Sequence, residues 1–341
     1  MKVAIVGASG YVGAELIALI SAHQAINLEH VLVSENSDAS GHLVCDLHPK
    51  LHKVCHLPLT PFSEQWFVDN VDSIDAVFFA TPHEYSAMWA EKFLNAGKKV
   101  FDLSGGFRLN NAEDYPKYYG FKHANETLLQ SAVYGLADWY ASDIANASLI
   151  AVPGCYPTAS LTALKPITEN ALQRDDSLIV INGISGVSGA GRKASLATSF
   201  NEVSLTPYNL LQHRHQPEIT QEAGVQVIFN PHLAPFKRGL LTTVTLQLKQ
   251  GVTGSDVLQA YEGAYQNSSV VRFKQTPPKI DNVVQTPFAD AYWQYDEQTQ
   301  TLVACCAIDN LLKGAASQAI QCANISMGLP SAYGLVNGVA L

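Results

Sequence analysis

A glycine-rich turn follows directly on the first apolar segment, and it restricts the fold of the N-terminal half more than any other feature. Val3–Val6 has the composition of a buried strand, the glycines at 7, 10 and 13 come next, and a helical pattern runs from Tyr11 to about Ala22. Small residues in such a turn let the backbone approach a pyrophosphate, whose charge faces the helix N-terminus. The spacing is Gly-x-x-Gly-x-x-Gly, which is looser than the common Gly-x-Gly-x-x-Gly pattern. The strand before it and the helix after it therefore carry the prediction of a dinucleotide site.

The end of the second predicted strand bears on which dinucleotide binds. An NAD site usually places Asp or Glu there to bind the ribose hydroxyls. This strand ends at Ser34, with Glu35 one residue later and Ser37 beyond it. A serine can donate to a 2′-phosphate, whereas Glu35 would repel one. The residues predicted to contact the cofactor here are Gly7, Ser9, Gly10, Tyr11, Val12, Gly13, Ser34 and Ser37.

The N-terminal half alternates apolar runs with helical segments, which predicts a doubly wound parallel sheet of the Rossmann type. Its strands are expected at 3–6, 28–33, 76–80, 100–103 and 149–152, and a second helix at 84–96 ends at Gly97. After Cys155 strands predominate, and several alternate as in an antiparallel sheet. They are expected at 178–184, 225–229, 242–248, 289–295 and 302–308, with a last helix from Lys313 to about Met327. The predicted fold class is therefore α/β, with an α+β second part.

Composition narrows the possible functions. With 341 residues and 47% hydrophobic content, two domains are more probable than one. A net charge of −9 disfavours nucleic-acid binding, which needs a concentrated basic surface. No apolar stretch is long enough to span a membrane and no secretory signal is visible, so we expect a cytoplasmic protein. The six cysteines include no Cys-x-x-Cys pair, which predicts neither a disulfide framework nor a metal site.

One of those cysteines has the setting of a nucleophile. Cys155 lies in the run Pro-Gly-Cys-Tyr-Pro-Thr-Ala, after the apolar strand 149–152 and before a helical pattern at 157–170. A thiol at a helix N-terminus lies near unsatisfied backbone N–H groups and the positive end of the helix dipole, which favours the nucleophilic thiolate. A buried structural cysteine is the alternative, but the flanking Gly and Pro argue against a packed core position.

Three further groups of residues are candidates for chemistry. His213 and His215 bracket Arg214, and a Cys–His pair is the standard way to activate a thiol. The loop 183–193 is rich in Gly and Ser and ends in Arg192 and Lys193, a composition that suits a phosphate. Ser104 and Arg108 follow the strand at 100–103 and are candidates for a second anionic group, with a structural ion pair an equal alternative for Arg108.

These parts fit one reaction. A thiolate attacks an acyl phosphate and expels inorganic phosphate, which leaves a thioester. Hydride from a reduced nicotinamide cofactor then converts the thioester to a thiohemiacetal, which collapses to an aldehyde. Backbone N–H groups near Cys155 would stabilise each oxyanion, and a histidine would move the protons.

Six motifs, in this order, resemble those of the N-acetyl-γ-glutamyl-phosphate reductase family over essentially the whole chain. They are 7–13 (Gly-Ala-Ser-Gly-Tyr-Val-Gly), 102–108 (Asp-Leu-Ser-Gly-Gly-Phe-Arg), 152–158 (Val-Pro-Gly-Cys-Tyr-Pro-Thr), 185–193 (Ser-Gly-Val-Ser-Gly-Ala-Gly-Arg-Lys), 213–219 (His-Arg-His-Gln-Pro-Glu-Ile) and 309–316 (Asp-Asn-Leu-Leu-Lys-Gly-Ala-Ala). The resemblance implies an NADPH-dependent reduction of N-acetyl-γ-glutamyl phosphate to N-acetyl-L-glutamate 5-semialdehyde with release of phosphate, in arginine biosynthesis. It also implies a homodimer or homotetramer.

Roles carry over to matching positions. The resemblance implies that Cys155 is the nucleophile and His215 the acid/base, with His213 as the fallback. Arg108, Arg192 and Lys193, with Ser104, would line the substrate and phosphate pocket. The expected cofactor is NADP(H), and its further contacts are Ser188, Gly189 and Asn310. Many family members have a basic residue near position 34–37, where this chain has none.

The resemblance also implies a division into domains. Residues 1–150 are expected to form the NAD(P)-binding domain, to which a C-terminal helix at 313–330 returns. Residues 151–312 are expected to form a catalytic and dimerisation domain of the glyceraldehyde-3-phosphate dehydrogenase type.

Two other functions remain open from sequence. Aspartate-semialdehyde dehydrogenase uses the same parts on another acyl phosphate. A non-catalytic dinucleotide-binding redox sensor would keep the glycines but would have no need of a Cys–His pair with a phosphate loop.

Overall fold

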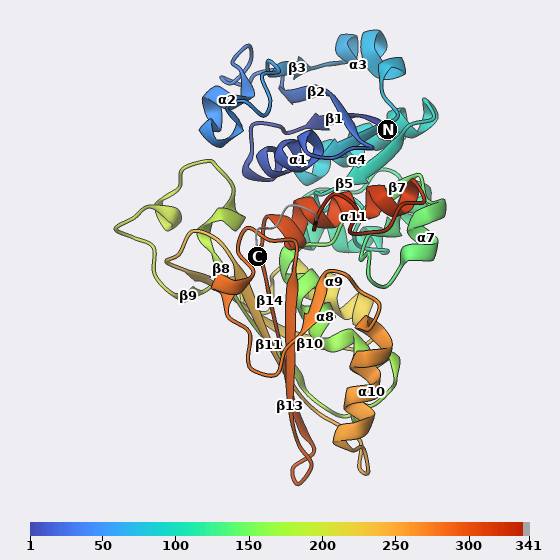
Figure 1. The fold of residues 1–341 in the computed structure, drawn as a ribbon, viewed down its shortest axis with the longest axis vertical. Coiled ribbons are helices and arrows are strands. Elements are labelled where there is room, and N and C mark those ends of the chain that lie inside the picture. Colours follow the sequence, from blue (N-terminus) through green and yellow to red (C-terminus); the bar gives the residue numbers. More distant parts are fainter. Residues whose placement is uncertain (337–341) are drawn as a thin grey trace. The chain divides into compact units, whose positions relative to one another are not determined.

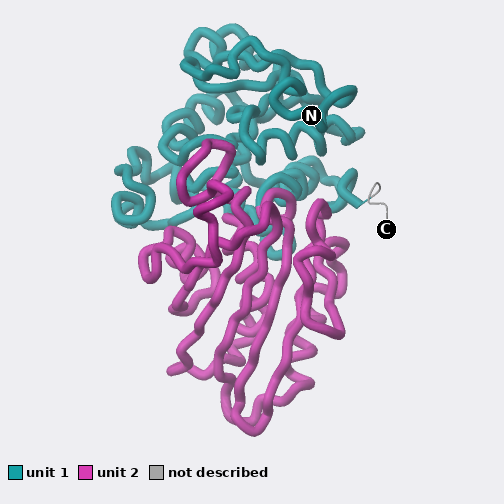
Figure 2. Tube along the Cα trace, turned by 90° about the vertical axis from the view of Figure 1, so that its left-hand side faces the viewer, with its two compact units in different colours: residues 1–153, 315–341 teal, residues 154–314 magenta. Residues whose placement is uncertain are grey.

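The computed structural model describes residues 1–336 and consists of two compact units. The first contains residues 1–153 and 315–336, and the second contains residues 154–314 (Figure 2). The expected division at residue 150 lies close to this one, and the last helix belongs to the first unit.

The first unit is built on a seven-stranded sheet in which every pair of neighbouring strands is parallel (Figure 1). In spatial order the strands are β3 (Thr60–Phe62), β2 (Asn27–Ser34), β1 (Lys2–Val6), β4 (Ala76–Phe79), β5 (Lys99–Asp102), β7 (Leu149–Ala151) and β6 (Val133–Tyr134). β1 and β4 are apolar and almost fully buried, as expected of strands covered on both faces. The predicted doubly wound sheet is confirmed.

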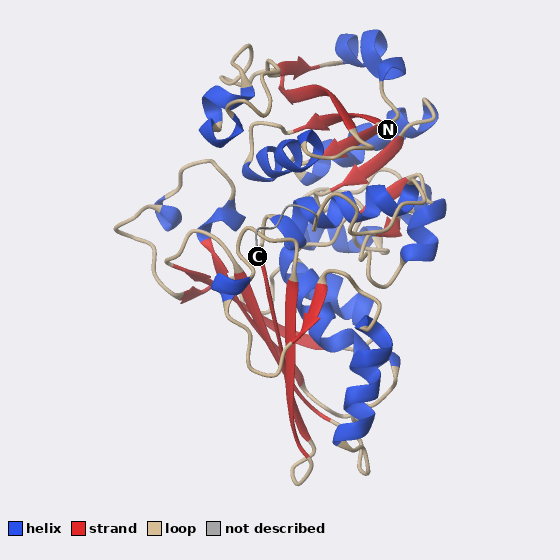
Figure 3. Ribbon diagram, viewed as in Figure 1, coloured by secondary structure: helices blue, strands red, loops and turns tan. Residues whose placement is uncertain are grey.

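Eight helices accompany this sheet among the described residues (Figure 3). They are α1 (Tyr11–Ser21), α2 (Val44–Leu47), α3 (Glu64–Asn70), α4 (His83–Asn95), α5 (Tyr115–Tyr118), α6 (Glu126–Ser131), α7 (Ala141–Asn146) and α11 (Ser317–Ser326). α11 packs on α1 and α7. Its Cys322 thiol donates to the Gly135 carbonyl at 3.2 Å, and its Asn324 side chain bonds His23 at 2.9 Å. These contacts hold the C-terminal helix on the parallel sheet.

Aromatic side chains fill one face of the first unit. Phe62 of β3 lies against Trp89 of α4 with ring centroids 4.5 Å apart, and Phe67 meets Phe93 edge to face at 4.9 Å. Phe62 and Phe93 are completely buried. Each such ring stabilises the fold by about 1.5–3 kcal/mol through burial alone, which fixes α4 on the sheet.

The second unit contains a seven-stranded mixed sheet (Figure 1). In spatial order the strands are β12 (Val271–Phe273), β13 (Ala289–Asp296), β14 (Thr301–Ile308), β11 (Leu240–Gln247), β8 (Ile179–Gly186), β10 (Val227–Ala234) and β9 (Thr206–Pro207). Four neighbouring pairs are antiparallel, whereas β8–β10 and β12–β13 are parallel. β11 alternates buried and half-buried residues along its length, as a strand with one covered face does.

Three helices belong to the second unit: α8 (Cys155–Glu169), α9 (His215–Ala223) and α10 (Gly254–Tyr265). α8 is buried over residues 156–167 and packs on β11, β13 and β14. The Tyr261 hydroxyl of α10 donates to the Ala163 carbonyl, and the Tyr265 hydroxyl donates to the Thr162 carbonyl at 2.9 Å. α8 is thus the central helix of this unit, and its first residue is held in a fixed place.

Several elements differ from the predictions, among them α8, the last helix and α10. α8 begins at Cys155, two residues before the predicted start, because Gly154 adopts an extended conformation and caps the helix. The last helix begins at Ser317 rather than Lys313, since a π-helical turn occupies Leu312–Ala316. α10 was not predicted at all. None of the helices within residues 1–336 is long and apolar enough to cross a membrane.

Candidate active site

Cys155 occupies the first position of α8 and is partly accessible, although the residues after it in the helix are buried. The Thr158 N–H and hydroxyl both bond the Gly154 carbonyl at 2.9 Å, which closes the first turn. The first backbone N–H groups of a helix have no partner within it and carry partial positive charge. The thiol therefore lies where a thiolate, and the oxyanion of an adduct on it, would be stabilised.

A buried glutamate fixes the residue before the thiol. The Gly154 N–H donates to Oε1 of Glu218 at 2.9 Å, and Glu218 is fully buried in the first turn of α9. This bond joins the N-terminal turns of α8 and α9. Glu218 lies three residues after His215, on the same helical face. Sequence analysis quoted Glu218 within a motif but gave it no role.

Both predicted histidines lie beside the residue that follows the thiol. The Tyr156 ring is 6.0 Å from the rings of His213 and His215, which are 4.7 Å from each other. The Tyr156 hydroxyl donates to the His232 carbonyl at 2.9 Å, so its ring is fixed. The structure therefore places both histidine rings around the residue that follows Cys155 in the chain.

The two histidines differ in their hydrogen bonding. Nδ1 of His213 accepts the backbone N–H of His215 at 3.1 Å. Burial, and secondly the neighbouring Arg214, lower the pKa of His213 to about 3. His213 is thus neutral at neutral pH and its Nδ1 is occupied. A ring in this state positions its neighbour better than it moves a proton.

Two glycines let other segments reach the site. A Cβ built on Gly314 would lie 2.7 Å from the Cβ of Cys155, and one on Gly183 would lie 2.5 Å from the Tyr156 ring. Real Cβ atoms do not approach so closely, so both positions exclude a side chain. Gly314 falls inside the motif at 309–316, but nothing in its sequence context showed that it faces the nucleophile.

The loop after β8 brings three predicted cofactor residues together. Asn310 Nδ2 donates to the Ser188 hydroxyl at 3.0 Å, and a Cβ on Gly189 would lie 3.7 Å from the same nitrogen. Asp309 beside them bonds Arg238 at 2.5 Å and accepts the Leu311 N–H at 2.9 Å. Further along this loop, Arg192 and Lys193 are exposed.

In the first unit the glycine turn has the shape that sequence analysis expected. Gly7 has φ +91°, and a Cβ there would lie 2.2 Å from the Ala80 carbonyl oxygen. A Cβ on Gly13 would lie 2.6 Å from the Gly7 carbonyl oxygen, whereas one on Gly10 has nothing closer than 3.4 Å. Gly7 thus forms the turn, and Gly13 allows the helix to pack closely on the strand. Gly10 has no side chain that would keep a pyrophosphate away from the backbone. Together with the N–H groups at Ser9, Tyr11 and Val12, this cradle fits a dinucleotide.

Ser34 is the last residue of β2 and is exposed, at the position where dinucleotide sites contact the ribose. The Ser37 N–H donates to the Ser34 carbonyl at 3.0 Å, and the Ser37 hydroxyl accepts the Ala39 N–H at 3.2 Å. The exposed Glu35 follows immediately. Both serines therefore belong to the turn that follows β2.

The loop after β5 holds Ser104 and Arg108 in place through buried hydrogen bonds. The Ser104 hydroxyl bonds Ser86 at 2.9 Å and accepts the Gly106 N–H at 3.1 Å. Arg108 donates from Nε to the Val152 carbonyl and from Nη2 to the Leu103 carbonyl, both at 2.8 Å. Arg108 is thus bonded to two backbone carbonyls of the first unit. One of these carbonyls lies just upstream of Cys155.

Comparison with known proteins identifies the family to which this chain is similar. Residues 2–147 match the model of the semialdehyde dehydrogenase NAD-binding domain, and residues 155–310 match that of the semialdehyde dehydrogenase dimerisation domain. The N-acetyl-gamma-glutamyl-phosphate reductase of Pseudoalteromonas atlantica is 50% identical over 340 residues, covering 100% of this chain and 99% of its own. That of Idiomarina loihiensis is 51% identical over 336 residues, covering 98% and 97%.

Solved structures show the same fold at lower identity. Aspartate semialdehyde dehydrogenase II from Vibrio cholerae has a TM-score of 0.71 at 18% identity and covers 96% of this chain and 98% of its own. The aspartate semialdehyde dehydrogenase from Candida albicans, solved with NADP, has a TM-score of 0.67 at 15% identity and covers 95% and 97%. With a dinucleotide-binding unit, a thiol at a helix N-terminus and full-length relatives at half identity, this chain belongs to the N-acetyl-γ-glutamyl-phosphate reductase family of the semialdehyde dehydrogenases.

Proposed function

We propose that this chain reduces N-acetyl-γ-glutamyl phosphate to N-acetyl-L-glutamate 5-semialdehyde with NADPH and releases phosphate, as a step of arginine biosynthesis. Its full-length relatives carry the name of that activity. The observation that carries the mechanism is the setting of Cys155. It is partly exposed at the first position of α8, next to a tyrosine whose ring lies 6.0 Å from each of the two histidines.

In the first half of the reaction the Cys155 thiolate attacks the acyl carbon of the substrate. The carbon–sulfur bond forms, the bond from the acyl carbon to the phosphate oxygen breaks, and phosphate leaves with the electron pair. The backbone N–H groups at the start of α8 stabilise the oxyanion of the tetrahedral intermediate. The product of this half is a thioester on Cys155.

When bound, the reduced dinucleotide would supply the hydride that converts the thioester on Cys155 to the next tetrahedral oxyanion. His215 protonates the resulting oxyanion to give a thiohemiacetal. When His215 takes that proton back, the carbon–sulfur bond breaks, the aldehyde leaves and the thiolate is restored. His213 supports this assignment because its neutral ring accepts the His215 N–H and so orients the acid/base.

Binding roles follow from charge and from hydrogen-bonding capacity. Arg192 and Lys193 are the proposed partners of the phosphate group, since both are exposed cations at the end of a glycine-rich loop. Ser104 and Arg108 are proposed to shape the substrate pocket. The turn at 7–13, the serines at 34 and 37, and the cluster of Ser188, Gly189 and Asn310 are proposed to hold the cofactor.

We assign NADP(H) rather than NAD(H) as the cofactor, and a homodimer or homotetramer as the assembly. The exposed hydroxyl of Ser34 at the end of β2 can donate to a 2′-phosphate, which supports this assignment, whereas the adjacent Glu35 opposes it. The match of residues 155–310 to a dimerisation domain supports self-association.

The test is the reverse reaction. The purified chain is expected to oxidise N-acetylglutamate semialdehyde only when both phosphate and NADP are present. Aspartate semialdehyde is the substrate control and NAD the cofactor control. Faster turnover of aspartate semialdehyde would contradict the substrate, and faster turnover with NAD would contradict the cofactor alone.

A dinucleotide-binding sensor without turnover is the alternative from another class, and alkylation separates it from an enzyme. Iodoacetamide should abolish the phosphate-dependent reaction as Cys155 is modified. A sensor would keep its cofactor affinity and would have no such activity to lose.

A further inference from the structure

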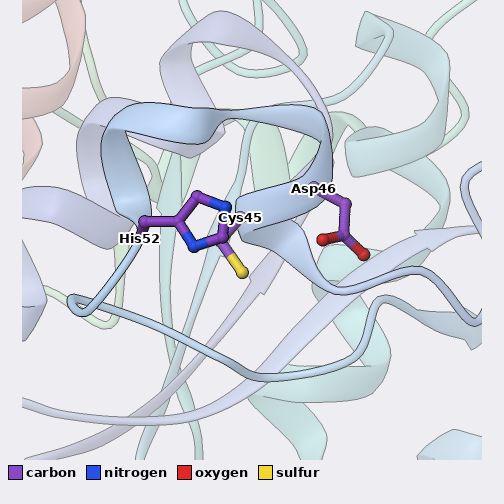
Figure 4. Close-up of side chains that lie close together, drawn as sticks. All are labelled: Cys45, Asp46 and His52. Carbon is purple, nitrogen blue, oxygen red and sulfur yellow. The ribbon is translucent and has the colours of Figure 1, made fainter.

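A short segment of the first unit gathers soft metal ligands away from the residues proposed for catalysis. Residues 42–56, here termed the His/Cys segment, include α2 and the turns that follow it. Its side chains include two cysteines and four histidines, and one group among them is close-packed. Ligand atoms of Cys45, Asp46 and His52 all lie within 4.8 Å of one another (Figure 4).

His56 lies outside this group of three, but its ring faces the same sulfur. Its Nδ1 lies 3.6 Å from the Cys45 Sγ. Zinc binds thiolate at about 2.3 Å and imidazole at about 2.0–2.1 Å, so sulfur and nitrogen ligands at two corners of a tetrahedron lie about 3.6 Å apart. The Cys45–His56 distance is thus already that of a metal-bound pair.

Burial differs among the four side chains in a way that suits an accessible metal site. Cys45 is 1% exposed, whereas Asp46, His52 and His56 are exposed. Asp46 accepts the Leu43 N–H with Oδ2 at 3.2 Å, which fixes its carboxylate at the start of α2. A cation can therefore reach the site from solvent through the exposed carboxylate and imidazoles.

Backbone pairing at both ends of the His/Cys segment fixes the arrangement before any metal binds. The Gly41 N–H donates to the Leu59 carbonyl and the Leu59 N–H to the His42 carbonyl, both at 2.9 Å. Between them the chain turns back at Lys53, which adopts a left-handed φ of +62°. Because of this turn, His56 lies next to the Cys45 sulfur. Ligands that are already arranged before binding lower the entropic cost of binding a metal.

The spacing of the proposed ligands along the chain explains why the absence of Cys-x-x-Cys pairs did not indicate this metal site. The ligands are Cys45-x₆-His52-x₃-His56, and only the His-x₃-His part resembles a common zinc spacing. The single cysteine comes from the helix before it. The earlier expectation that the chain has no metal site rested on the absence of Cys-x-x-Cys and did not consider mixed ligands.

The His/Cys segment also contacts the glycine turn of the same unit. Nε2 of His48 bonds the Ser9 carbonyl at 3.0 Å, and Lys50 forms an ion pair with Glu15 of α1. A metal bound by the His/Cys segment would therefore stabilise residues that contact the glycine turn and α1.

We propose that Cys45, Asp46 and His52, joined by His56 as the fourth ligand when its ring turns toward the bound ion, form a binding site for a soft divalent cation of the Zn²⁺ type. Binding replaces the proton of the Cys45 thiol by the metal, and that proton goes to solvent.

Cobalt is the probe that reports the ligands directly. Full-length protein with Cys155→Ser, which removes the proposed catalytic thiolate as a competitor, is titrated with CoCl₂. We expect one equivalent to give a thiolate-to-cobalt charge-transfer band in the near ultraviolet and the visible bands of a tetrahedral site. Zn²⁺ should displace it.

Variants in the same background identify the ligands. Cys45→Ser should abolish the charge-transfer band, and His52→Asn or His56→Asn should weaken Co²⁺ binding at least about tenfold, since each removes a direct ligand. The matched controls are His42→Asn and Cys55→Ser in the same segment, which should bind as the parent does. His52 and His56 are exposed, so their replacement tests the site even if Cys45→Ser fails to fold.

Absence of the band in the parent would overturn the proposal. So would a band that survives in Cys45→Ser, or affinity that is unchanged in both His52→Asn and His56→Asn. None of these outcomes bears on the reductase activity, because the assay measures metal binding alone.

Discussion

At the scale of single residues, Cys155 combines an accessible sulfur with the N-terminal position of a buried helix. We predict that Cys155→Ser lowers kcat/KM by at least about three orders of magnitude, because the thioester route closes. Dinucleotide affinity should stay unchanged, since the glycine turn belongs to the other unit. Steady-state kinetics and a fluorescence titration with NADPH measure the two effects.

The chain supplies a matched control for that substitution. Cys305 on β14 is also partly accessible, and burial raises the pKa of its thiol. Cys305→Ser should keep turnover within a few-fold of the parent. Near-normal turnover in Cys155→Ser would remove this residue from the mechanism.

The two histidines give a second prediction at this scale. His215→Asn should lower kcat by roughly 10²–10⁴-fold, the range for a lost general acid/base. His213→Asn should cost less, because Asn Oδ1 can accept the His215 N–H in place of Nδ1. The pH profile of kcat should lose a limb only in His215→Asn. A larger loss in His213→Asn would transfer the role to His213.

Functional residues could be predicted from the sequence where their role depends on their own side chain and on the residues next to them in the chain. Cys155 and the histidine pair could be proposed from sequence because Gly, Pro and Arg flank them in recognisable patterns. Glu218 and Gly314 were not found, because their roles depend on contacts with residues far away along the chain. Glu218 bonds Gly154 across 64 residues, and nothing local distinguishes it from a surface carboxylate.

At the scale of elements, the start of α8 depends on a close approach by the π-helical turn at Leu312–Ala316. We predict that Gly314→Ala lowers kcat by about 10²-fold, because its Cβ, built 2.7 Å from that of Cys155, must displace the nucleophile. Gly263→Ala in α10 is the control, since a Cβ there meets nothing within 4 Å. It should leave kcat unchanged and stabilise the helix by up to about 1 kcal/mol.

Steady-state kinetics and thermal unfolding of both variants separate the site from the fold. A Gly314→Ala protein with full turnover would mean that the segment moves away at little cost, and that α8 does not need this contact.

Elements were predictable where one signal dominated. The buried strands β1, β4 and β5 were found because each is a short apolar run covered on both faces. The edge strands β3, β6 and β9 were missed, since they have only two or three residues and gain their pairing from a neighbour. α10 was missed because its apolar positions are few and its packing on α8 relies on two tyrosine hydroxyls.

At the scale of the whole molecule, the fold of the N-terminal part could be predicted because a parallel sheet requires strands and helices to alternate along the chain. The mixed sheet of the second unit has no such rule, since parallel and antiparallel pairs depend on which strands meet. The helix α11 belongs to the first unit because it packs on α1 and α7. The sequence pattern of α11 predicts an apolar helix but does not indicate which elements it packs on.

Stability of the whole chain should depend on pH through His213. Its native pKa of about 3, lowered by burial and then by Arg214, lies below the ordinary value of 6.5. Between these values the unfolded chain binds a proton that native His213 does not. Its stabilising contribution is therefore complete above pH 6.5 and is lost as the pH falls toward 3.

Asparagine at position 213 keeps an acceptor for the His215 N–H but does not titrate. We therefore predict that the fall in the free energy of unfolding between pH 7 and pH 5 is smaller by about 1–2 kcal/mol in His213→Asn than in the parent. Urea unfolding followed by circular dichroism at both pH values measures this difference. His23, His30 and His123 have pKa values that burial also lowers, but their effect is common to both proteins and cancels. The exposed His42→Asn serves as the control, and equal pH dependence in His213→Asn and the parent would show that His213 can take up a proton without leaving its place.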